Sequence, residues 1–446
     1  MIKKNQLNQK NIIYKYRLLF FYCRFMKPYL DKIPFYRKIA KKLWLWHWQF
    51  FLKIKSRMQS IDLNKIYWID PKKIEYSFHE NWHYLSKKLL YPDNGRENYH
   101  DLNFPGNLIK FEDRQAYSGL YQHFIQSRKW PDTDFYHIVL RQMQEGVFRW
   151  GCSSEEEFKE RCTQLDKLYK DIKEKGYKTQ KNLDSKKDLK SRGIREARDE
   201  IKLFIGRDGD LIHCDGQHRL VMAKLLNLKK VPFKIYERHP EWLKFRKKLF
   251  RFARKEMNGK TLEPLLHPDL REIISLCGNK RFEMLKRNIK IKNGTLLDMF
   301  SHWGYFCHQF EEMGYDCTAY EENLKNGYFL NKLKRAGNKK FTIIEESIYK
   351  YKNRLHFDIV LMLNFPYSIL DNTGRYNQFL KLLKKINTSE IYFQLNPLNL
   401  SLRKNGESFC KDDLKKQLID MLLKNTNLKN VNCIGEIEND KIFKLS

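Results

Sequence analysis

Apolar and polar residues follow two different periods along this chain, and the change of period predicts where strands and helices lie. Toward the C-terminus, short apolar runs such as residues 357–365 (FDIVLMLNF) alternate with amphipathic stretches such as residues 411–425 (KDDLKKQLIDMLLKN). Buried strands that alternate with helices are typical of a parallel sheet with helices on both faces. The pattern therefore predicts a doubly wound α/β domain over residues 271–446, which ends in a hairpin at residues 431–446.

The middle of the chain is predicted to hold short strands around a long helical stretch. Residues 64–76 (NKIYWIDPKKIEY) alternate like a strand and then turn at Asp70, and residues 111–180 carry the period of amphipathic helices. These segments predict an α+β domain over residues 61–240 with a helical insertion at about 111–180, joined to the last domain by a helical linker over residues 241–270. Three further strands are predicted at residues 201–205, 211–213 and 231–236, and a helix at residues 220–226.

The first 60 residues differ from both domains in charge. Residues 1–58 hold fifteen Lys and Arg residues and a single acid, Asp31, and residues 37–55 (RKIAKKLWLWHWQFFLKIK) place Trp and Phe at helical spacing among lysines. A basic helix that carries indole rings is typical of the surface of an anionic membrane. The same mixture also suits RNA, and a helix that packs on its own domain is a third interpretation.

The composition agrees with a large, basic, globular protein. The chain has 446 residues, of which 42% are hydrophobic, and its formal net charge of +33 attracts nucleic acid, anionic lipid or phosphorylated substrates. Nine cysteines without a C-x-x-C pair or a zinc spacing predict a reducing compartment and no metal site. Since we find no secretory signal and no run of ~20 apolar residues, we expect a cytoplasmic protein, at most peripheral to the inner face of the cell membrane.

One candidate site lies at residues 214–219 (CDGQHR), between a predicted strand and a predicted helix. Gly216 lets the backbone turn, and the amides of Gln217, His218 and Arg219 then fall at the start of the helix. Free N–H groups and the helix dipole favour phosphate there, and Arg219 can add a bidentate contact. A tight turn with an Asp cap and a solvated arginine is the alternative interpretation.

Residues 215–232, from DGQHR through the helix to NLKKVP, resemble the ParB/sulfiredoxin-like domain, and residues 66–74 (IYWIDPKKI) are similar to the opening strand of that family. The resemblance implies a phosphate or nucleotide site at the turn, with a nucleoside di- or triphosphate and Mg as ligands. It leaves the reaction open, because members act on DNA, cleave nucleotides or transfer phosphate. A phosphate transfer would need a carboxylate or a histidine, for which Asp215, Asp208 and His218 are the nearest candidates.

The second candidate site is the loop after the first strand of the C-terminal domain. Residues 296–323 (LLDMFSHWGYFCHQFEEMGYDCTAYEEN) predict a strand, a loop at 299–304, a helix, and a second strand that ends at Glu321. Glu321 lies 17 positions after Gly304, close to the ~20 residues that separate a glycine loop from a ribose-binding acid in dinucleotide folds. Phe300 occupies a usual glycine position, which disfavours a pyrophosphate. S-adenosyl-L-methionine has no phosphate, so its binding does not require the backbone of the turn to approach a pyrophosphate.

This stretch resembles motif I of class I S-adenosylmethionine-dependent methyltransferases, and the likeness continues over residues 271–446 in the order of strands and helices. The resemblance implies a Rossmann-like domain that binds S-adenosyl-L-methionine. His302 flanks the loop and could take a proton. The cofactor positions that the resemblance implies are Asp298 and Gly304 in the loop, Glu321 at the ribose, and Glu346 and Ser347 near the adenine, with Asn364 at the end of the fourth strand, which faces the transferred methyl group.

The sequence leaves the methyl acceptor open. Residues 364–367 (NFPY) are similar to the N-P-P-Y box of adenine amino-methyltransferases, which holds a flipped base, although Phe365 replaces the first proline. One interpretation is a membrane-surface methyltransferase that modifies a phosphorylated or lipid-linked glycan. The others are a nucleic-acid methyltransferase or DNA-binding protein, and a binding protein without catalysis. The candidate catalytic residues are Asn364, His302 and Asp215.

Overall fold

The computed structural model divides into two compact units, Met1–Lys65 and Ile66–Ser446, and the second unit holds the sheets described below. The predicted basic segment at residues 1–60 lies outside the described residues. The structure describes residues 62, 65–78, 108–146, 152–179, 200–344, 347–350, 355–366, 369–370, 372–395, 403–404, 407–408, 411–437 and 440–446.

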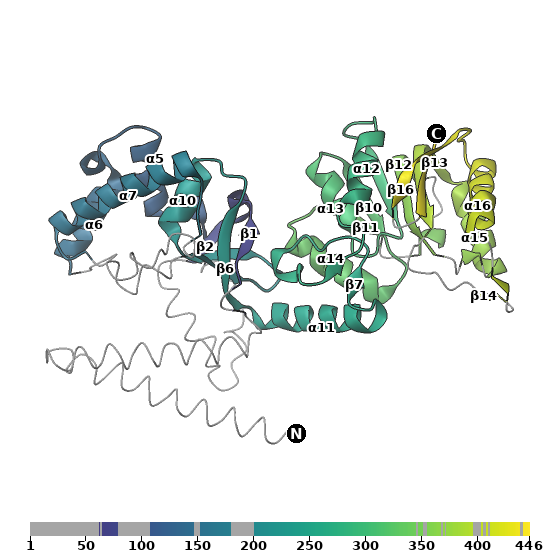
Figure 1. The fold of residues 1–446 in the computed structure, drawn as a ribbon, viewed down its shortest axis with the longest axis horizontal. Helices are drawn as coiled ribbons and strands as arrows, with labels where there is room; N and C mark the ends of the chain where they lie inside the picture. The colour runs from purple at the N-terminus through teal and green to yellow at the C-terminus, as the bar shows by residue number, and fades with distance from the viewer. Residues whose placement is uncertain are drawn as a thin grey trace, which may run out of the picture. The chain divides into compact units, whose positions relative to one another are not determined.

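A six-stranded mixed sheet forms the first part of the second unit, with the strand order β1-β6-β4-β5-β2-β3 (Figure 1). Leu203, Ile205 and Ile212 of its central strands are fully buried, which agrees with the period-2 pattern of the sequence. β4 pairs in parallel with β6 and antiparallel with β5. The strands are β1 Tyr67–Ile69, β2 Tyr76–Phe78, β3 Leu108–Lys110, β4 Ile201–Ile205, β5 Leu211–Asp215 and β6 Val231–Arg238.

Helices occupy the predicted insertion between β3 and β4. The longest begins after Ser154, whose side chain accepts a hydrogen bond from the Glu157 amide, and it ends at Gly176 with φ +73. The predicted helical insertion is therefore confirmed for the described residues. Its helices are α5 Gln115–Phe124, α6 Asp134–Gln144 and α7 Glu155–Lys175, with short 3-10 turns at Phe111–Asp113 and Trp130–Asp132.

The turn at Asp215 is tighter than the sequence predicts. β5 continues through Asp215 instead of ending at residue 213, and helix α10, Gln217–Leu225, begins three residues earlier than expected. Gly216 has φ +81 and ψ +30, so a single left-handed residue reverses the chain. The predicted strand and helix limits were wrong because one glycine replaces the longer turn.

The predicted helical linker at residues 241–270 is only half helical. Helix α11, Pro240–Glu256, ends where Asn258 and Gly259 have positive φ values of +50 and +75. The next residues form a short strand and a 3-10 turn instead of more helix, because Pro264 and Pro268 cannot continue a helix. The elements that follow α11 are β7 Lys260–Thr261, a 3-10 turn at Pro268–Leu270, β8 Ile274–Ser275 and α12 Lys280–Asn288.

A seven-stranded sheet forms the C-terminal part, in the order β11-β10-β9-β12-β13-β17-β16 (Figure 1). The first five strands are parallel, and β17 is antiparallel to β13 and to β16. The predicted doubly wound sheet and terminal hairpin are therefore confirmed. The strands are β9 Thr295–Met299, β10 Asp316–Tyr320, β11 Thr342–Ile344, β12 Leu355–Phe365, β13 Ile386–Leu395, β16 Val431–Ile437 and β17 Asp440–Leu445, with a small pair β14 Arg403–Lys404 and β15 Glu407–Ser408.

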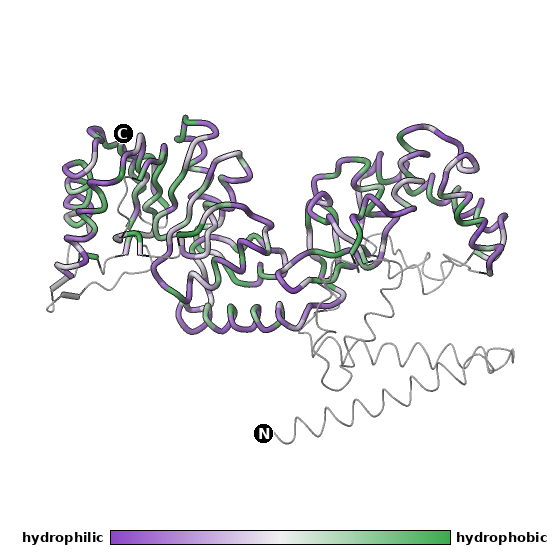
Figure 2. Tube along the Cα trace, turned by 180° about the vertical axis from the view of Figure 1, so that it is seen from behind, coloured by the Kyte–Doolittle hydropathy of each residue, from purple (hydrophilic) through white to green (hydrophobic). Residues whose placement is uncertain are grey.

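Two apolar clusters cover the two faces of this sheet. One cluster joins the sheet to α12 and α13, through residues such as Leu285 and Phe310, and the other joins it to α15 and α16, through residues such as Phe379 and Leu422. Figure 2 shows the hydrophobic residues gathered along the strands. No helix among the described residues is long and apolar enough to cross a membrane. The helices are α13 Tyr305–Glu312, α14 Leu324–Ala336, α15 Thr373–Leu383 and α16 Lys411–Asn425.

Candidate functional sites

The loop between β9 and α13 keeps the backbone of a glycine-rich loop although two of its glycines are missing. φ is +66 at Phe300, +53 at His302 and +79 at Gly304, so every second residue is left-handed. A side chain in this region costs roughly 1–2 kcal/mol relative to glycine. Such conformations persist only where the surroundings impose them, and they are frequent at ligand sites. The predicted helix start at Tyr305 is confirmed, and the loop is one residue shorter than predicted, because β9 continues through Met299.

Hydrogen bonds from the neighbouring strand hold this loop in place. The Ser301 amide donates to the Tyr320 carbonyl at 2.9 Å, and the His302 amide donates to Oε2 of Glu321 at 2.8 Å. Gly304 closes the turn, because its amide donates to the Ser301 carbonyl at 2.8 Å. The end of β10 therefore fixes the shape of the loop that follows β9.

Glu321, the expected ribose ligand, turns toward the loop. Its Oε1 accepts a hydrogen bond from the Asn323 amide at 2.8 Å, in addition to the bond from His302. The Asn326 side chain donates a third hydrogen bond to this carboxylate. A carboxylate offers about four lone-pair positions, so about one remains for a ligand hydroxyl unless Asn326 gives way. Burial raises the pKa of Glu321 to about 7, against the hydrogen bonds from the two amides, which lower it.

The two large rings of the loop are core residues on different sides of it. Phe300 is 7% exposed and packs on Tyr320 and Phe365, at ring distances of 6.5 and 5.8 Å. Trp303 packs instead on Phe252 of α11 and Phe329 of α14, at 6.2 and 5.5 Å. Phe300 thus belongs to the apolar cluster that also contains Tyr320 and Phe365, at the ends of β10 and β12.

A buried set of charges lies beside the loop, at the ends of β9 and β12. Arg281 of α12 is fully buried, pairs with Glu263 and donates to the carbonyl of Leu363. Asp298 is 1% exposed, and its Oδ2 accepts a weak hydrogen bond from the Cys307 thiol at 3.9 Å. Burial, with Glu263 nearby, raises the pKa of Asp298 well above its ordinary value. The sequence pointed to Asp298 but not to Glu263 or Arg281, which carry no motif.

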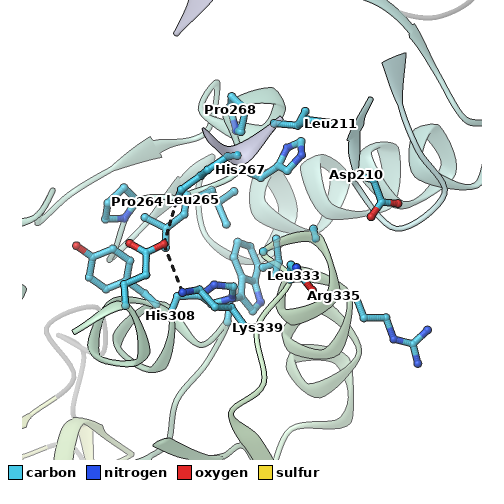
Figure 3. Close-up of a pocket in the computed structure, with 18 of the residues that line it drawn as sticks. Asp210, Leu211, Pro264, Leu265, His267, Pro268, His308, Leu333, Arg335 and Lys339 are labelled. Atoms are coloured by element: carbon cyan, nitrogen blue, oxygen red, sulfur yellow. Dashed lines mark hydrogen bonds and ion pairs between the residues drawn. The ribbon is translucent and has the colours of Figure 1, made fainter. Parts of the chain in front are cut away.

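A cavity of about 480 Å³ opens beside this loop (Figure 3). Ser301 Oγ and Trp303 Nε1 are buried without a hydrogen-bond partner among the described residues, and both residues line the cavity. Glu312 also lines the cavity, where it accepts a hydrogen bond from Lys73 at 2.8 Å and pairs with Lys339 at 3.3 Å. Two kinds of polar group therefore line the cavity: hydrogen-bonding groups of the loop without a partner among the described residues, and a carboxylate that is paired with two lysines.

The histidines at the loop are uncharged at neutral pH. Burial lowers the pKa of His302 to about 4, and burial with Lys339 nearby lowers the pKa of His308 to about 3. His302 stacks on Trp303 at 4.6 Å. A group with a pKa near 4 is a weak general base at neutral pH, which makes a positioning role the better account of His302.

The remaining cofactor and catalytic candidates are described only in part. Ser347 is half-buried next to Tyr320, whose pKa is raised to about 12 by burial. Glu346 lies outside the described residues, as does Tyr367. Asn364 has its backbone in β12, next to the carbonyl that receives Arg281, and its side chain is outside the described part of the chain.

The turn at Asp215 forms the second candidate site. A Cβ at Gly216 would lie 2.9 Å from the Cα of Ile201, so the backbones approach too closely for any other residue. Asp215 accepts from the Gly216 amide at 2.8 Å and from Lys202 Nζ at 2.7 Å. Burial raises the pKa of Asp215, but Lys202 and the amide outweigh it and lower the pKa below its ordinary value. Asp215 is therefore ionised and stabilises the turn through its hydrogen bonds. An ionised carboxylate has no proton to donate, so Asp215 does not suit the role of a general acid.

Arg114 completes this turn, and the sequence did not point to it. Its Nε donates to Gln217 Oε1 at 3.1 Å, and its Nη1 donates to Ser77 Oγ at 2.8 Å and to the Phe78 carbonyl at 2.9 Å. Arg219, also at the helix start, is half-buried. The start of α10 thus has two guanidinium groups in its surroundings, together with the ammonium of Lys202.

His218 and Asp208, the other candidates for phosphate chemistry, are placed elsewhere. The His218 side chain is buried, with its ring centroid 6.4 Å from that of Phe135, and burial lowers its pKa to about 3. His218 therefore offers its backbone amide at the helix start. Asp208 pairs with Lys332 of α14 at 2.7 Å. Among the described residues, no group of three His, Cys, Asp or Glu side chains could hold a metal ion.

Comparisons with known proteins find similar folds and no family. No protein-family profile and no curated protein matches the sequence. The bifunctional kinase-methyltransferase WbdD is similar with a TM-score of 0.32 and 15% identity, over 44% of this chain and 46% of that chain. The PH0226 protein of Pyrococcus horikoshii OT3 has a TM-score of 0.31 and 13% identity, over 44% of this chain and 97% of its own length.

The glycopeptide N-methyltransferase MtfA has a TM-score of 0.28 and 10% identity, over 38% of this chain and 89% of its own length. This chain therefore spans less than half of WbdD and most of the other two. Likenesses at these TM-scores carry no weight for the activity of this chain, so the function is argued from the geometry of its own residues.

Proposed function

We propose that residues 271–446 are a methyltransferase domain that uses S-adenosyl-L-methionine. The supporting observation is the loop in which positions 300, 302 and 304 are all left-handed, held by the acid at the end of the next strand. This loop leaves β9, from which the strand order runs to β10 on one side and to β12 on the other. Ligands of open α/β sheets bind at the carboxyl ends of the strands at such a switch point.

The charges around the loop favour this cofactor over a dinucleotide. Asp298, Glu263 and Glu321 are acids within or beside the loop, and the buried cation Arg281 is paired with Glu263. Glu321, ionised above its pKa of about 7, would repel a pyrophosphate and attract a sulfonium or an ammonium group. When bound, the cofactor supplies an electrophilic methyl group.

The protein residues then have distinct roles in binding. Glu321, ionised above its pKa of about 7, accepts hydrogen bonds from the ribose hydroxyls while it continues to hold the loop. We assign Asp298 to the amino-acid part of the cofactor and Ser347 to the adenine, with Glu346 as a further candidate at the adenine and Asn364 as the candidate at the transferred methyl group. His302 keeps the loop in its left-handed form and is not the first choice for a general base.

We further infer an anion site at Gly216–Arg219 in the N-terminal domain, for the phosphates of a nucleotide or a phosphorylated acceptor. The supporting observation is that Arg114 and Lys202 donate hydrogen bonds to Gln217 and Asp215 at the start of α10, the helix to which Arg219 also belongs. Backbone amides and guanidinium groups are the usual partners of phosphate. A nucleoside di- or triphosphate with Mg as its counterion is the ligand that we would test first.

The acceptor that suits both sites is an anionic, phosphorylated or lipid-linked glycan at a membrane surface. Adenine in nucleic acid is the second candidate, because residues 364–367 (NFPY) end β12 beside the switch point. Phe365, however, is fully buried among core rings. A protein that binds the cofactor without catalysis is the third candidate.

Calorimetry and label transfer test these proposals in order. S-adenosyl-L-methionine should bind the wild-type protein, and Glu321→Ala should weaken binding tenfold or more. Radiolabelled methyl groups should then be offered with a lipid-linked saccharide extract, RNA and duplex DNA. Label only in the nucleic acids would reject the glycan acceptor, and absence of cofactor binding would reject the methyltransferase itself. A rise in melting temperature with nucleoside triphosphate, lost in Arg114→Ala, would support the anion site.

A further inference from the structure

One face of helix α11 is an uninterrupted basic surface. Six of its cationic residues recur at intervals of three and four, so they lie on one side of the helix, and all six are exposed, whereas Arg246 is buried. The acids of α11 are confined to its ends, at Glu241 and Glu256. We call these residues the α11 basic face: Lys244, Lys247, Lys248, Arg251, Arg254 and Lys255.

Most of this charge is available to a partner. Lys244 pairs with Glu241 at 2.7 Å, but among the described residues none pairs with Lys247, Arg251 or Arg254. Each cation that is left in water without a counter-charge contributes to the field that attracts anions. The face therefore presents a row of unneutralised charge along a well-ordered helix.

The opposite side of α11 is already occupied. Trp242, Phe245 and Leu249 are buried, and Phe252 packs on Trp303 and Phe329. Helices that insert into a bilayer need a free apolar face. α11 cannot offer one, so it can meet a partner only through its charges. Figure 2 shows this as an alternation of hydrophilic and hydrophobic residues along the helix.

An exposed apolar pair adjoins the basic face. Leu324 is 88% exposed and Tyr328, one turn later on α14, is 39% exposed. Lys248 Nζ lies 3.7 Å from the centre of the Tyr328 ring, which joins α11 to this part of α14. Cations beside an exposed leucine and tyrosine are typical of a surface that rests at the headgroup level of a bilayer, where the apolar side chains enter the interface.

We propose that the α11 basic face, together with Leu324 and Tyr328, is a docking surface for an anionic lipid bilayer. This surface holds the protein against the membrane through its cations and these two side chains. Nucleic acid would also be attracted by the charges, and a single base could stack on Tyr328, but the exposed Leu324 offers it neither an aromatic ring nor a charge. The proposal does not depend on methyl transfer and can be tested without it.

Co-sedimentation of the full-length chain with vesicles tests the docking surface. Vesicles of phosphatidylcholine alone are compared with vesicles that also contain phosphatidylglycerol. The triple variant K247E/R251E/R254E should lose about a hundredfold in partitioning to the anionic vesicles, because each basic residue near such a surface contributes about fivefold. Leu324→Ser should lose a few-fold on the same vesicles and nothing on duplex DNA.

The matched control carries the same change of charge at another exposed place. Lys286, Arg287 and Lys290 lie in and after the last turn of α12 and are exposed, and K286E/R287E/K290E should keep vesicle binding within a few-fold of wild type. Equal losses in both triple variants would reduce the effect to net charge and overturn the proposal. A loss on duplex DNA with unchanged vesicle binding would reassign the face to nucleic acid and overturn it too. Unchanged melting curves show that the variants are folded.

Discussion

Gly216 and Gly304 each precede a helix with the same backbone conformation, but the charged side chains around them have opposite signs. Each is the residue before a helix, α10 or α13, with φ of +81 or +79 and no side-chain cap. Arg114 and Lys202 surround the first turn, whereas the acid Glu321 holds the loop at the second. In both domains, the left-handed glycine leaves the first amide groups of the helix without a side-chain cap.

In both places the backbone exposes amide groups, and residues of the neighbouring elements set the local charge. At Gly216 the turn is one residue long, and cations favour a phosphate. At Gly304 the loop is longer, and acids favour a cationic cofactor without phosphate. Substitutions that act on the glycine should therefore affect both sites alike, while substitutions of the surrounding charges should separate them.

Gly304→Val should have the largest effect. A β-branched residue at φ +79 is strongly strained, and its Cβ would lie 2.5 Å from Leu330 Cδ1. We expect a loss of about 3 kcal/mol in unfolding free energy, and no measurable binding of S-adenosyl-L-methionine by calorimetry. Gly327→Ala, in α14 with nothing within 4 Å of the added Cβ, is the matched control. Normal cofactor binding by the Val variant would show that the loop is not the cofactor site.

Glu321→Gln should change the pH dependence of stability. The pKa of Glu321 is about 7 in the folded protein and 4.5 without that environment, so the folded state binds a proton that the unfolded state releases between these values. The unfolding free energy should therefore fall as pH rises from about 4.5 to about 7, by about 3 kcal/mol. Glutamine cannot titrate, so denaturant titrations of the variant should lack this fall. An identical profile in both proteins would contradict the raised pKa.

Gly216→Ala tests the other turn. The new Cβ would lie 2.9 Å from the backbone of Ile201 and would adopt φ +81, for which we expect a loss of about 2 kcal/mol in unfolding free energy. Gly146→Ala has a similar φ of +76 with nothing within 4 Å, so it measures the conformational cost alone. If the two variants lose the same stability, the close approach of β4 to the turn has no energetic consequence.

His302→Gly should have the smallest effect on stability and decide the role of the side chain. Glycine relieves the strain at φ +53 but removes the stacking on Trp303, and we expect the unfolding free energy to change by less than about 1 kcal/mol. If His302 positions the loop, methyl transfer with the glycine variant stays within a few-fold of wild type. A loss of 100-fold or more in turnover with intact cofactor binding would instead identify His302 as the general base.

Local pattern in the sequence was sufficient for most elements of the C-terminal domain. Strand β10 lies where the alternation placed it, and α13 begins at Tyr305 as Gly304 indicated. These elements were predictable because period and glycine position are local properties. The tight turn at Gly216 was mispredicted, since a contact with a distant residue, Ile201, decides it. The linker was mispredicted beyond Glu256 although Pro264 and Pro268 are local signals against a helix there.

The candidate sites show the same division more strongly. The sequence by itself determined that an acid follows a glycine loop by one helix and one strand, and that Gly216 precedes a helix. Only the tertiary structure decided that Phe300 and His302 adopt glycine conformations, that Arg281 pairs with Glu263 beside the loop, and that Arg114 reaches the start of α10. The spacing of residues along the chain shows the period of a helix or strand. The burial and the charge of a site depend on residues that are far apart in the sequence and meet only in the folded protein.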